Sequence, residues 1–213
     1  MDSVDGTVYI VDDDSGVRTA TARLVRSLGM QAETFASAQE FLEFDRPHNP
    51  SCLVLDVRMP GLNGLDLQEE MVRRYLELPI VFITGHGDIP MTVQAMKRGA
   101  QDFLTKPFDE EELIAAIERS IERDQEQRHE RDAKLEIRQR LDTLTPRERQ
   151  VLSLVVTGML NKQIAGQLGT TEKTVKVHRA RAMKKMKAHS LAEAVRMTES
   201  VGLSSESHAI HAP

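Results

Sequence analysis

The 213-residue sequence has no tryptophan, one cysteine and few aromatic side chains. The shortage of rings argues against a carbohydrate-binding site or an aromatic cage for cations. A single cysteine, Cys52, excludes an intrachain disulfide framework and favours a reducing compartment. No apolar stretch approaches membrane-spanning length, and no signal-peptide pattern is evident. We therefore expect a cytoplasmic protein that has no membrane partner.

The net charge of −5 is distributed unevenly along the chain. Residues 1–118 carry 10 Lys/Arg and 21 Asp/Glu, whereas residues 145–197 carry 11 Lys/Arg and three Asp/Glu. The segment between them, residues 119–144, carries seven of each sign. An acidic part and a basic part indicate two domains with different partners, and the basic part is the candidate for binding nucleic acid.

One continuous apolar run, residues 52–55, stops at Asp56. Uninterrupted apolar residues are typical of a strand buried on both faces of a parallel sheet. The proline and glycines of residues 60–64 favour a loop directly afterwards. Asp56 is therefore expected at the carboxyl end of a central strand, where open α/β sheets bind their ligands. An ordinary loop aspartate or helix cap is the structural alternative.

Five short segments with strand character, the second of them weak, alternate with helical patterns in the first 120 residues. They lie at residues 8–11, 32–35, 52–55, 79–84 and 102–104. A Ser37–Glu40 capping box marks the start of one intervening helix. Strands that alternate with helices predict an α/β fold with a doubly wound, five-stranded parallel sheet.

Polar side chains follow four of these strands. Asp12 and Asp13 follow the first, Asp56 the third, Thr84 the fourth and Lys106 the fifth. Parallel strands place all of them at one edge, where crowded carboxylates require a shared proton, a lysine or a hard cation. Oxygen-only ligands suit Mg²⁺, and a metal, a lysine and a hydroxyl together suit a phosphoryl group on aspartate. A merely structural acidic cluster is the alternative.

Residues 5–118 resemble the receiver domain of two-component response regulators. The match rests on Asp12-Asp13, on Asp56 with the following Met59-Pro60-Gly61, on Thr84 and on Lys106-Pro107. The resemblance implies that a sensor histidine kinase transfers a phosphoryl group to Asp56. It also implies that phosphorylation produces a homodimer.

The same resemblance implies roles for individual residues. Asp13, Asp56 and the backbone carbonyl of Arg58 would ligate Mg²⁺, and Asp12 would support the metal through water. Thr84 would hydrogen-bond the phosphoryl group and Lys106 would pair with it. Phe103 takes the place of the aromatic residue that rotates inward on activation, although it lacks a phenolic hydroxyl; a plain core role is the alternative.

Residues 119–144 contain no Gly or Pro and predict a charged helical linker. A heptad seam continued from Ile114 meets only three further apolar residues, Ile117, Ile121 and Leu135. A stable coiled coil needs apolar residues at most seam positions. We therefore predict a helical spacer that pairs at most near Ile117 and Ile121.

Residues 145–203 predict four short helices. Thr145–Glu148 forms a capping box, Asn161 is expected to cap the second helix, and Thr170 or Thr171 the third. Gly169 allows a tight turn between the second and third helices, which indicates a helix-turn-helix. The tail, residues 204–213, is expected to be disordered.

The third of these helices has an apolar face and a basic face. Val175, Ala182 and Met186 are expected to pack inward. The candidate DNA-contacting residues are Lys173, Lys176, Val177, Arg179, Arg181 and Lys184. Lysine and arginine suit phosphates and guanine, and valine suits a thymine methyl group. A solvated basic helix with Val177 in the core is the alternative.

This second part resembles the four-helix DNA-binding domain of the LuxR/NarL type. Residues 144–152, 161–165 and 174–178 carry the match. Together with the receiver, it resembles NarL/FixJ-type response regulators, with residues 84–90 closer to the FixJ side. The resemblance implies that Lys176 and Val177 touch bases, and that a dimer binds double-stranded DNA with two half-sites.

Two other functions remain open. A haloacid-dehalogenase-like phosphatase also uses an aspartyl nucleophile, but it needs a second acid two residues later, where Arg58 stands. A pairing module whose helix-turn-helix binds protein is the third possibility. The expected protein is a transcription regulator that catalyses only its own Mg²⁺-dependent phosphorylation and is otherwise not an enzyme.

Overall fold

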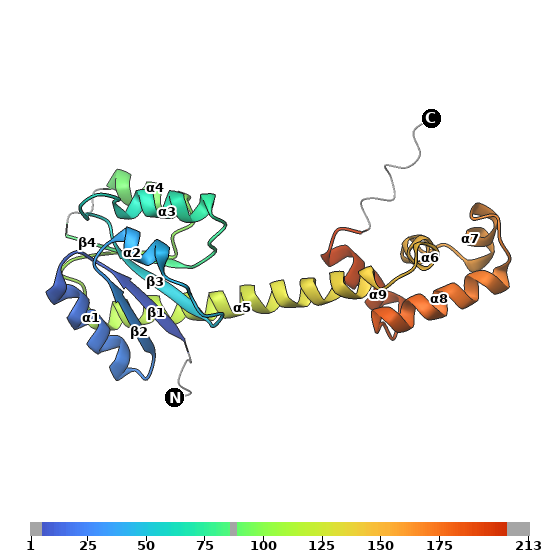
Figure 1. The fold of residues 1–213 in the computed structure, drawn as a ribbon, viewed down its shortest axis with the longest axis horizontal. Helices are drawn as coiled ribbons and strands as arrows, with labels where there is room; N and C mark the ends of the chain where they lie inside the picture. The colour runs from blue at the N-terminus through green and yellow to red at the C-terminus, as the bar shows by residue number, and fades with distance from the viewer. Residues whose placement is uncertain (1–5, 86–88, 204–213) are drawn as a thin grey trace. The chain divides into compact units, whose positions relative to one another are not determined.

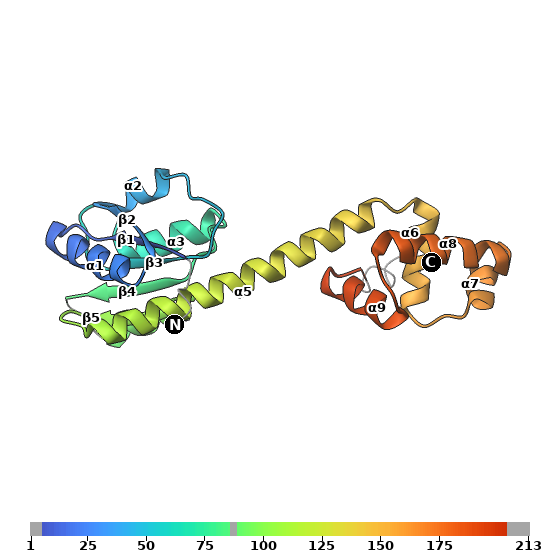
Figure 2. The same cartoon turned by 90° about the horizontal axis from the view of Figure 1, so that it is seen from below.

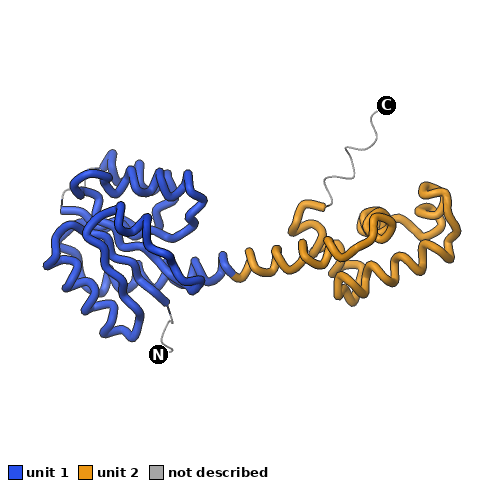
Figure 3. The backbone as a smooth tube through the Cα atoms, in the orientation of Figure 1, with its two compact units in different colours: residues 1–128 blue, residues 129–213 orange. Residues whose placement is uncertain are grey.

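The structure, a computed structural model, describes residues 6–85 and 89–203. Two compact units divide the chain at residue 128 (Figure 3). Helix α5 (Glu110–Asp142) contributes residues to both units. The tail, for which the sequence predicts disorder, and the central residues of the 84–90 loop lie outside the described residues.

The first unit contains the predicted five-stranded sheet. Its strands are β1 (Thr7–Val11), β2 (Gln31–Phe35), β3 (Ser51–Asp56), β4 (Ile80–Thr84) and β5 (Asp102–Thr105). Every pairing is parallel, and the strand order is β2-β1-β3-β4-β5. The α/β prediction is confirmed, and the order places the ends of β1, β3, β4 and β5 side by side.

Helices cover both faces of the sheet (Figures 1 and 2). Helix α1 (Ser15–Ser27) and the first part of α5 pack on one face. Helices α2 (Ala38–Glu43), α3 (Gly64–Arg73) and α4 (Ile89–Lys97) pack on the other. Strand β3 is buried along its whole length, which explains its continuous apolar run.

Helix α1 begins at a cap that the sequence reasoning missed. The Asp14 carboxylate accepts hydrogen bonds from the backbone N–H groups of Gly16 (2.7 Å) and Val17 (3.2 Å). These bonds hold the pKa of Asp14 below its ordinary value. An aspartate that directly precedes Ser15 and a helical pattern is a recognisable cap signal. The third aspartate of the acidic run therefore starts a helix.

The structure limits the pairing that the linker prediction left possible near Ile117 and Ile121. Helix α5 is continuous, as expected, but Ile117 and Ile121 are fully buried in the core of the first unit. They are therefore not available for pairing with a second linker. Asp124, which lies in the charged segment predicted to be the linker, is also fully buried. Packing against the first unit continues along α5 to Arg128, beyond the predicted domain boundary at residue 118.

The second unit contains α6 (Pro146–Val156), α7 (Asn161–Gln167), α8 (Glu172–Met186) and α9 (Leu191–Ser200). The end of α5 packs into its core through Ile137 and Leu141. The capping box at Thr145 is present, and Thr171 caps α8. The expectation that Asn161 is a cap is wrong, because α7 begins at Asn161 and Leu160 precedes it as N-cap.

Candidate functional site

The acidic side chains meet at the carboxyl edge of the sheet. Asp12 follows β1 and is fully buried, whereas Asp56 is the last residue of β3 and 5% exposed. Asp13 is exposed beside them. Carboxylate oxygens of all three lie within 4.8 Å of one another. Thr84 ends the neighbouring strand β4 and is also buried.

Lys106 links the two buried carboxylates. Its Nζ lies 2.6 Å from Asp12 Oδ2 and 3.3 Å from Asp56 Oδ1. Burial opposes the charge on Lys106, but the hydrogen bond and charge of Asp12, together with Asp56, raise the pKa of the lysine. Burial raises the pKa of Asp56 while Lys106 opposes that rise, and Asp12 adds to it. One ammonium thus offsets part of the repulsion at a site that still carries excess negative charge.

The donor set at this edge fits Mg²⁺. All three clustered side chains are carboxylates, and the exposed Asp13 leaves one side of the cluster open to water. Mg²⁺ prefers oxygen ligands and retains several waters. Arg58, whose carbonyl is the remaining predicted ligand, follows Val57 in the loop after β3. Val57 is anchored on both sides by hydrogen bonds to Ile83 (3.1 Å) and Gly64 (3.0 Å).

Gly64 is a further contributor to the site that sequence reasoning took only as a loop signal. A Cβ on this residue would lie 2.4 Å from the backbone carbonyl oxygen of Asp56 and 2.9 Å from Val57 Cα. Any side chain there would therefore displace the backbone that carries Asp56. The requirement arises because the loop returns against the strand end, which local sequence does not reveal.

Arg18 also supports the acidic loop and was not predicted. Its Nη1 donates to the backbone carbonyl of Asp12 at 2.6 Å. The Asp12 carboxylate in turn accepts from the Asp14 N–H at 2.8 Å. The loop between β1 and α1 is therefore held from both its backbone and its side chains.

Phe103 lies in the edge strand β5 and is partly buried. Its ring centroid is 6.1 Å from that of Phe82, and it packs against the core beneath α3 and α4. This position at the sheet edge gives the ring both a packed side and an exposed side. A switch role for Phe103 stays a prediction.

In the second unit, helix α8 presents the predicted two faces. Val175, Ala182 and Met186 are fully buried. Val177 is 43% exposed, which excludes the alternative that placed it in the core. Four of the predicted DNA-contacting cations on the same helix are exposed: Lys173, Lys176, Arg181 and Lys184. An exposed valine among cations is the pattern expected of a major-groove helix.

Arg179 differs from the other predicted DNA contacts. It is partly buried, and its Nη1 donates to Asn161 Oδ1 at 3.2 Å. The bond joins α8 to the first residue of α7. Arg179 thus has a positioning role within the helix-turn-helix, and any contact it makes with DNA stays a prediction.

An ion pair between α6 and α8 holds α8, the helix with the exposed basic face, against α6. Lys185 Nζ lies 2.6 Å from Glu148 Oε2 and donates to the Thr143 carbonyl at 3.0 Å. Lys185 and the capping hydrogen bonds of Thr145 lower the pKa of Glu148 to about 2. The same glutamate therefore closes the α6 cap and anchors α8.

Glu148→Gln is expected to flatten the pH dependence of the free energy of unfolding of this unit between pH 4.5 and about 2. The folded-state pKa lies below the ordinary value, so the stabilising contribution of the ionised group is complete above pH 4.5. It is lost as the pH falls through about 2. Hydrogen exchange of α6 and α8 amides across this range measures the effect.

The matched control for Glu148→Gln is Glu172→Gln, which removes an exposed glutamate that pairs with Lys176 at 3.5 Å. The control should keep the wild-type pH profile, since exposed pairs contribute little. Equal profiles for wild type and Glu148→Gln would contradict the anchoring role.

Within the described residues, no helix combines the length and apolar character needed to cross a bilayer.

Comparison with known proteins agrees with this geometry. The family described as "Response regulator receiver domain" matches residues 8–118, and "Bacterial regulatory proteins, luxR family" matches residues 142–198. Nodulation protein W of Bradyrhizobium diazoefficiens is 49% identical over 95% of this chain and 89% of its own length. Transcriptional regulatory protein FixJ of Azorhizobium caulinodans is 46% identical over 92% of this chain and 93% of its own.

Among solved structures, the response regulator StyR is 50% identical, covers 91% of this chain and 98% of its own, and superposes with a TM-score of 0.83. The chain combines an acidic site at the carboxyl edge of a parallel sheet with a helix-turn-helix. This combination defines the class of DNA-binding signalling regulators. The chain belongs to the two-component response regulators that combine a receiver domain with a LuxR-type DNA-binding domain.

Proposed function

We propose that Asp56 accepts a phosphoryl group from the phosphohistidine of a partner kinase, and that phosphorylation promotes pairing and operator binding. The observation that carries this proposal is the contact of Lys106 with the buried Asp12 and Asp56 at the end of β3. A carboxylate oxygen of Asp56 attacks phosphorus and forms a P–O bond. The P–N bond breaks, and the imidazole nitrogen keeps the electron pair.

The neighbouring residues of this chain position the transferred group. Lys106 exchanges its contact with Asp56 for the phosphoryl oxygens, and the Thr84 hydroxyl hydrogen-bonds one of them. Asp13, Asp56 and the Arg58 carbonyl would hold Mg²⁺, and Asp12 would support it through water. When bound, this ion offsets the charge of the carboxylates and the phosphoryl oxygens. Phe103 would follow Thr84 inward on activation.

A surface pocket beside the site supports the choice of partner. It has a volume of about 280 Å³ and lies between α1 and the start of α5. Val17, Leu24 and Phe108 supply an apolar lining, and Lys106 reaches its edge. An apolar helix of the kinase that carries the phosphohistidine fits a surface of this kind beside Asp56.

Exposed apolar residues on α4 support pairing of receivers. Ile89, Val93 and Met96 are 81%, 44% and 43% exposed and recur at helical spacing. A second copy of this stripe would remove them from water, since a C2 interface uses the same patch twice. Two paired chains would present two α8 helices to two half-sites.

The test is sedimentation equilibrium of the full chain with and without acetyl phosphate and Mg²⁺. The wild type should be monomeric without the phosphodonor and dimeric with it. Val93→Asp should accept phosphate but stay monomeric, because a charge in the stripe opposes its burial. Val72→Asp changes a valine on α3 that is 65% exposed and should pair normally.

A dimer that forms equally without phosphate would contradict this role of phosphorylation, and normal pairing by Val93→Asp would contradict the α4 interface. Multiple turnover of a generic phosphomonoester would favour the phosphatase alternative. Failure to shift any duplex from the source genome would favour the alternative in which the helix-turn-helix binds protein.

A further inference from the structure

A buried charged cluster lies away from the phosphoacceptor site, where α5 passes the beginning of β3. Asp124 is fully buried, although it belongs to the charged segment that the sequence assigns to a solvated linker. Its Oδ2 accepts a hydrogen bond from the Ser51 backbone N–H at 2.9 Å. The same oxygen accepts from Arg128 Nε at 2.6 Å. These two partners compensate the buried carboxylate of Asp124, which would otherwise be costly to remove from water.

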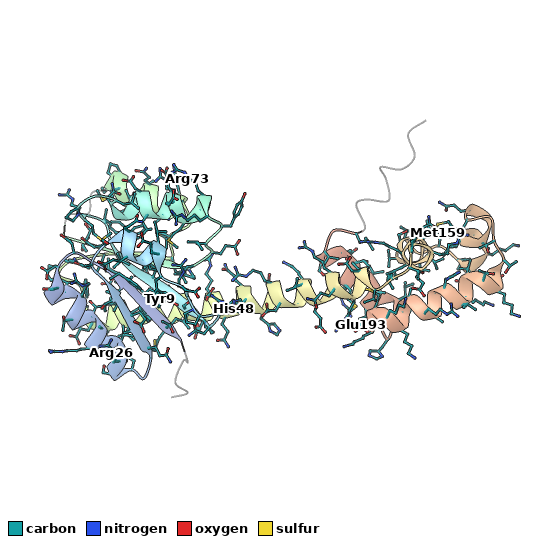
Figure 4. The ribbon with its side chains drawn as sticks, viewed as in Figure 1. Tyr9, Arg26, His48, Arg73, Met159 and Glu193 are labelled. Atoms are coloured by element: carbon teal, nitrogen blue, oxygen red, sulfur yellow. The ribbon has the colours of Figure 1, made fainter. Side chains whose placement is uncertain are left out.

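Arg128 extends this cluster to a third segment. Its Nη1 donates to His48 Nδ1 at 3.0 Å, and its side chain is only 16% exposed. Figure 4 labels His48 beside α5. Arg128 therefore ties one turn of α5 to the loop before β3, while Asp124 ties the preceding turn to β3 itself.

Apolar packing adjoins the cluster. A Cβ at Gly6 would lie 2.9 Å from two side-chain carbon atoms of Ile121, so the chain entering β1 runs directly against the helix. Ile121, Asp124 and Arg128 lie at spacings of three and four residues and thus on one face of α5. The helix is held against the first unit by one continuous stripe that ends at Arg128.

Beyond Arg128 the character of α5 changes. None of residues 129–136 is buried. The next anchoring residues, Ile137, Arg140 and Leu141, pack within the second unit, where Arg140 donates to the Met186 carbonyl at 3.1 Å. The segment of α5 that contributes no buried side chain between these two sets of anchors is therefore residues 129–136, which is shorter than the predicted linker.

We propose that Asp124 and Arg128 form a clamp that makes α5 a fixed part of the receiver up to residue 128, and that the DNA-binding response to phosphorylation requires this clamp. The regulatory half of the inference rests on the proposed function. Strand β3 joins the two ends of the receiver, because Ser51 at its start meets Asp124 and its last residue is Asp56. With the clamp open, the buried contacts of α5 with the receiver would end at Ile121, beyond which the exposed Arg123–Gln101 hydrogen bond (2.7 Å) would remain. Residues 122–128 would then open locally, independently of the receiver state.

The clamp is tested in the full chain by the double variant Asp124→Asn/Arg128→Met. The pair keeps similar volumes and leaves no unpaired buried charge. The matched control is Glu130→Gln/Lys134→Met, which removes an exposed pair with the same spacing on the same helix, 3.5 Å apart. Asp124→Asn alone provides a milder second variant.

Three measurements are made on each protein. Labelling of Asp56 by acetyl phosphate reports whether the receiver is folded and should be unchanged. Hydrogen exchange of the amides of residues 122–128 should become about tenfold faster in the clamp variant and stay unchanged in the control. The ratio of DNA affinities with and without phosphate, on a duplex selected with phosphorylated wild type, should fall about threefold or more only in the clamp variant.

Each outcome decides between the two proposals. If wild type shows no increase in DNA affinity on phosphorylation, the proposed function fails, while hydrogen exchange still tests the clamp. If wild type responds and the clamp variant exchanges slowly or responds equally, the inference is overturned. An equal fall in the affinity ratio of the control variant would also overturn the inference. The cause would then be the removal of any ion pair from α5 and not the loss of the clamp. If the double variant is not labelled, Asp124→Asn alone must give the same pattern or the inference fails.

Discussion

Asp56→Asn is expected to abolish formation of the acyl phosphate and to reduce labelling by acetyl phosphate to background. The amide has nearly the same volume as the carboxylate, so the fold should persist, but it is a poor nucleophile towards phosphorus. Asp56 is the last residue of the buried strand β3 and has Lys106 Nζ at 3.3 Å. The other two carboxylates of the cluster, Asp12 and Asp13, lie in the loop after β1 and not at the end of β3. Asp12 is engaged by Lys106 at 2.6 Å and by the Asp14 N–H.

The measurement is an acid-stable, base-labile phosphoryl adduct formed in the presence of Mg²⁺. Asp45→Asn, which changes an exposed aspartate in the loop after α2, is the matched control and should label like wild type. Similar urea midpoints for the three proteins would establish that folding is not the cause. Equal labelling of Asp56→Asn and wild type would refute the assignment of the phosphoacceptor.

Lys176→Ala and Val177→Ala are expected to weaken DNA binding in different ways. Val177 is 43% exposed on the basic face of α8, so we expect Val177→Ala to remove a base contact and not core packing. It should cost about 1–3 kcal/mol on a specific duplex and little on a scrambled one. Lys176, with a side chain 64% exposed, should lower affinity for both duplexes if it binds phosphate. The salt slope should then fall by about one.

Titrations at several salt concentrations separate these outcomes, with a specific duplex selected by the phosphorylated wild-type protein. Arg196→Ala, an exposed arginine on α9, serves as the control and should leave specificity unchanged. A Val177→Ala variant that loses affinity equally on both duplexes would argue against base reading. A Lys176→Ala variant that loses only specific binding would indicate a base contact and not a phosphate contact.

The sequence alone was sufficient to predict both folds and the composition of the acidic site. The apolar run that ends at Asp56 identifies a strand buried on both faces, and parallel strands necessarily bring their carboxyl ends to one edge. Asp12, Asp56 and Lys106 could therefore be grouped before any coordinates were known. The Thr145 capping box and the turn at Gly169 were likewise local signals, since each depends on residues only a few positions apart.

Contacts between residues far apart in the chain needed the tertiary structure. Ile117, Ile121 and Asp124 share one helix face, but spacing cannot tell whether that face meets a sheet or a second helix. The structure places it on the sheet, where Asp124 accepts from Ser51. Arg179 looked like its exposed basic neighbours until the fold brought Asn161 to 3.2 Å from it. Local pattern determines which residues form an element, whereas the partner of a face is decided by how the elements pack.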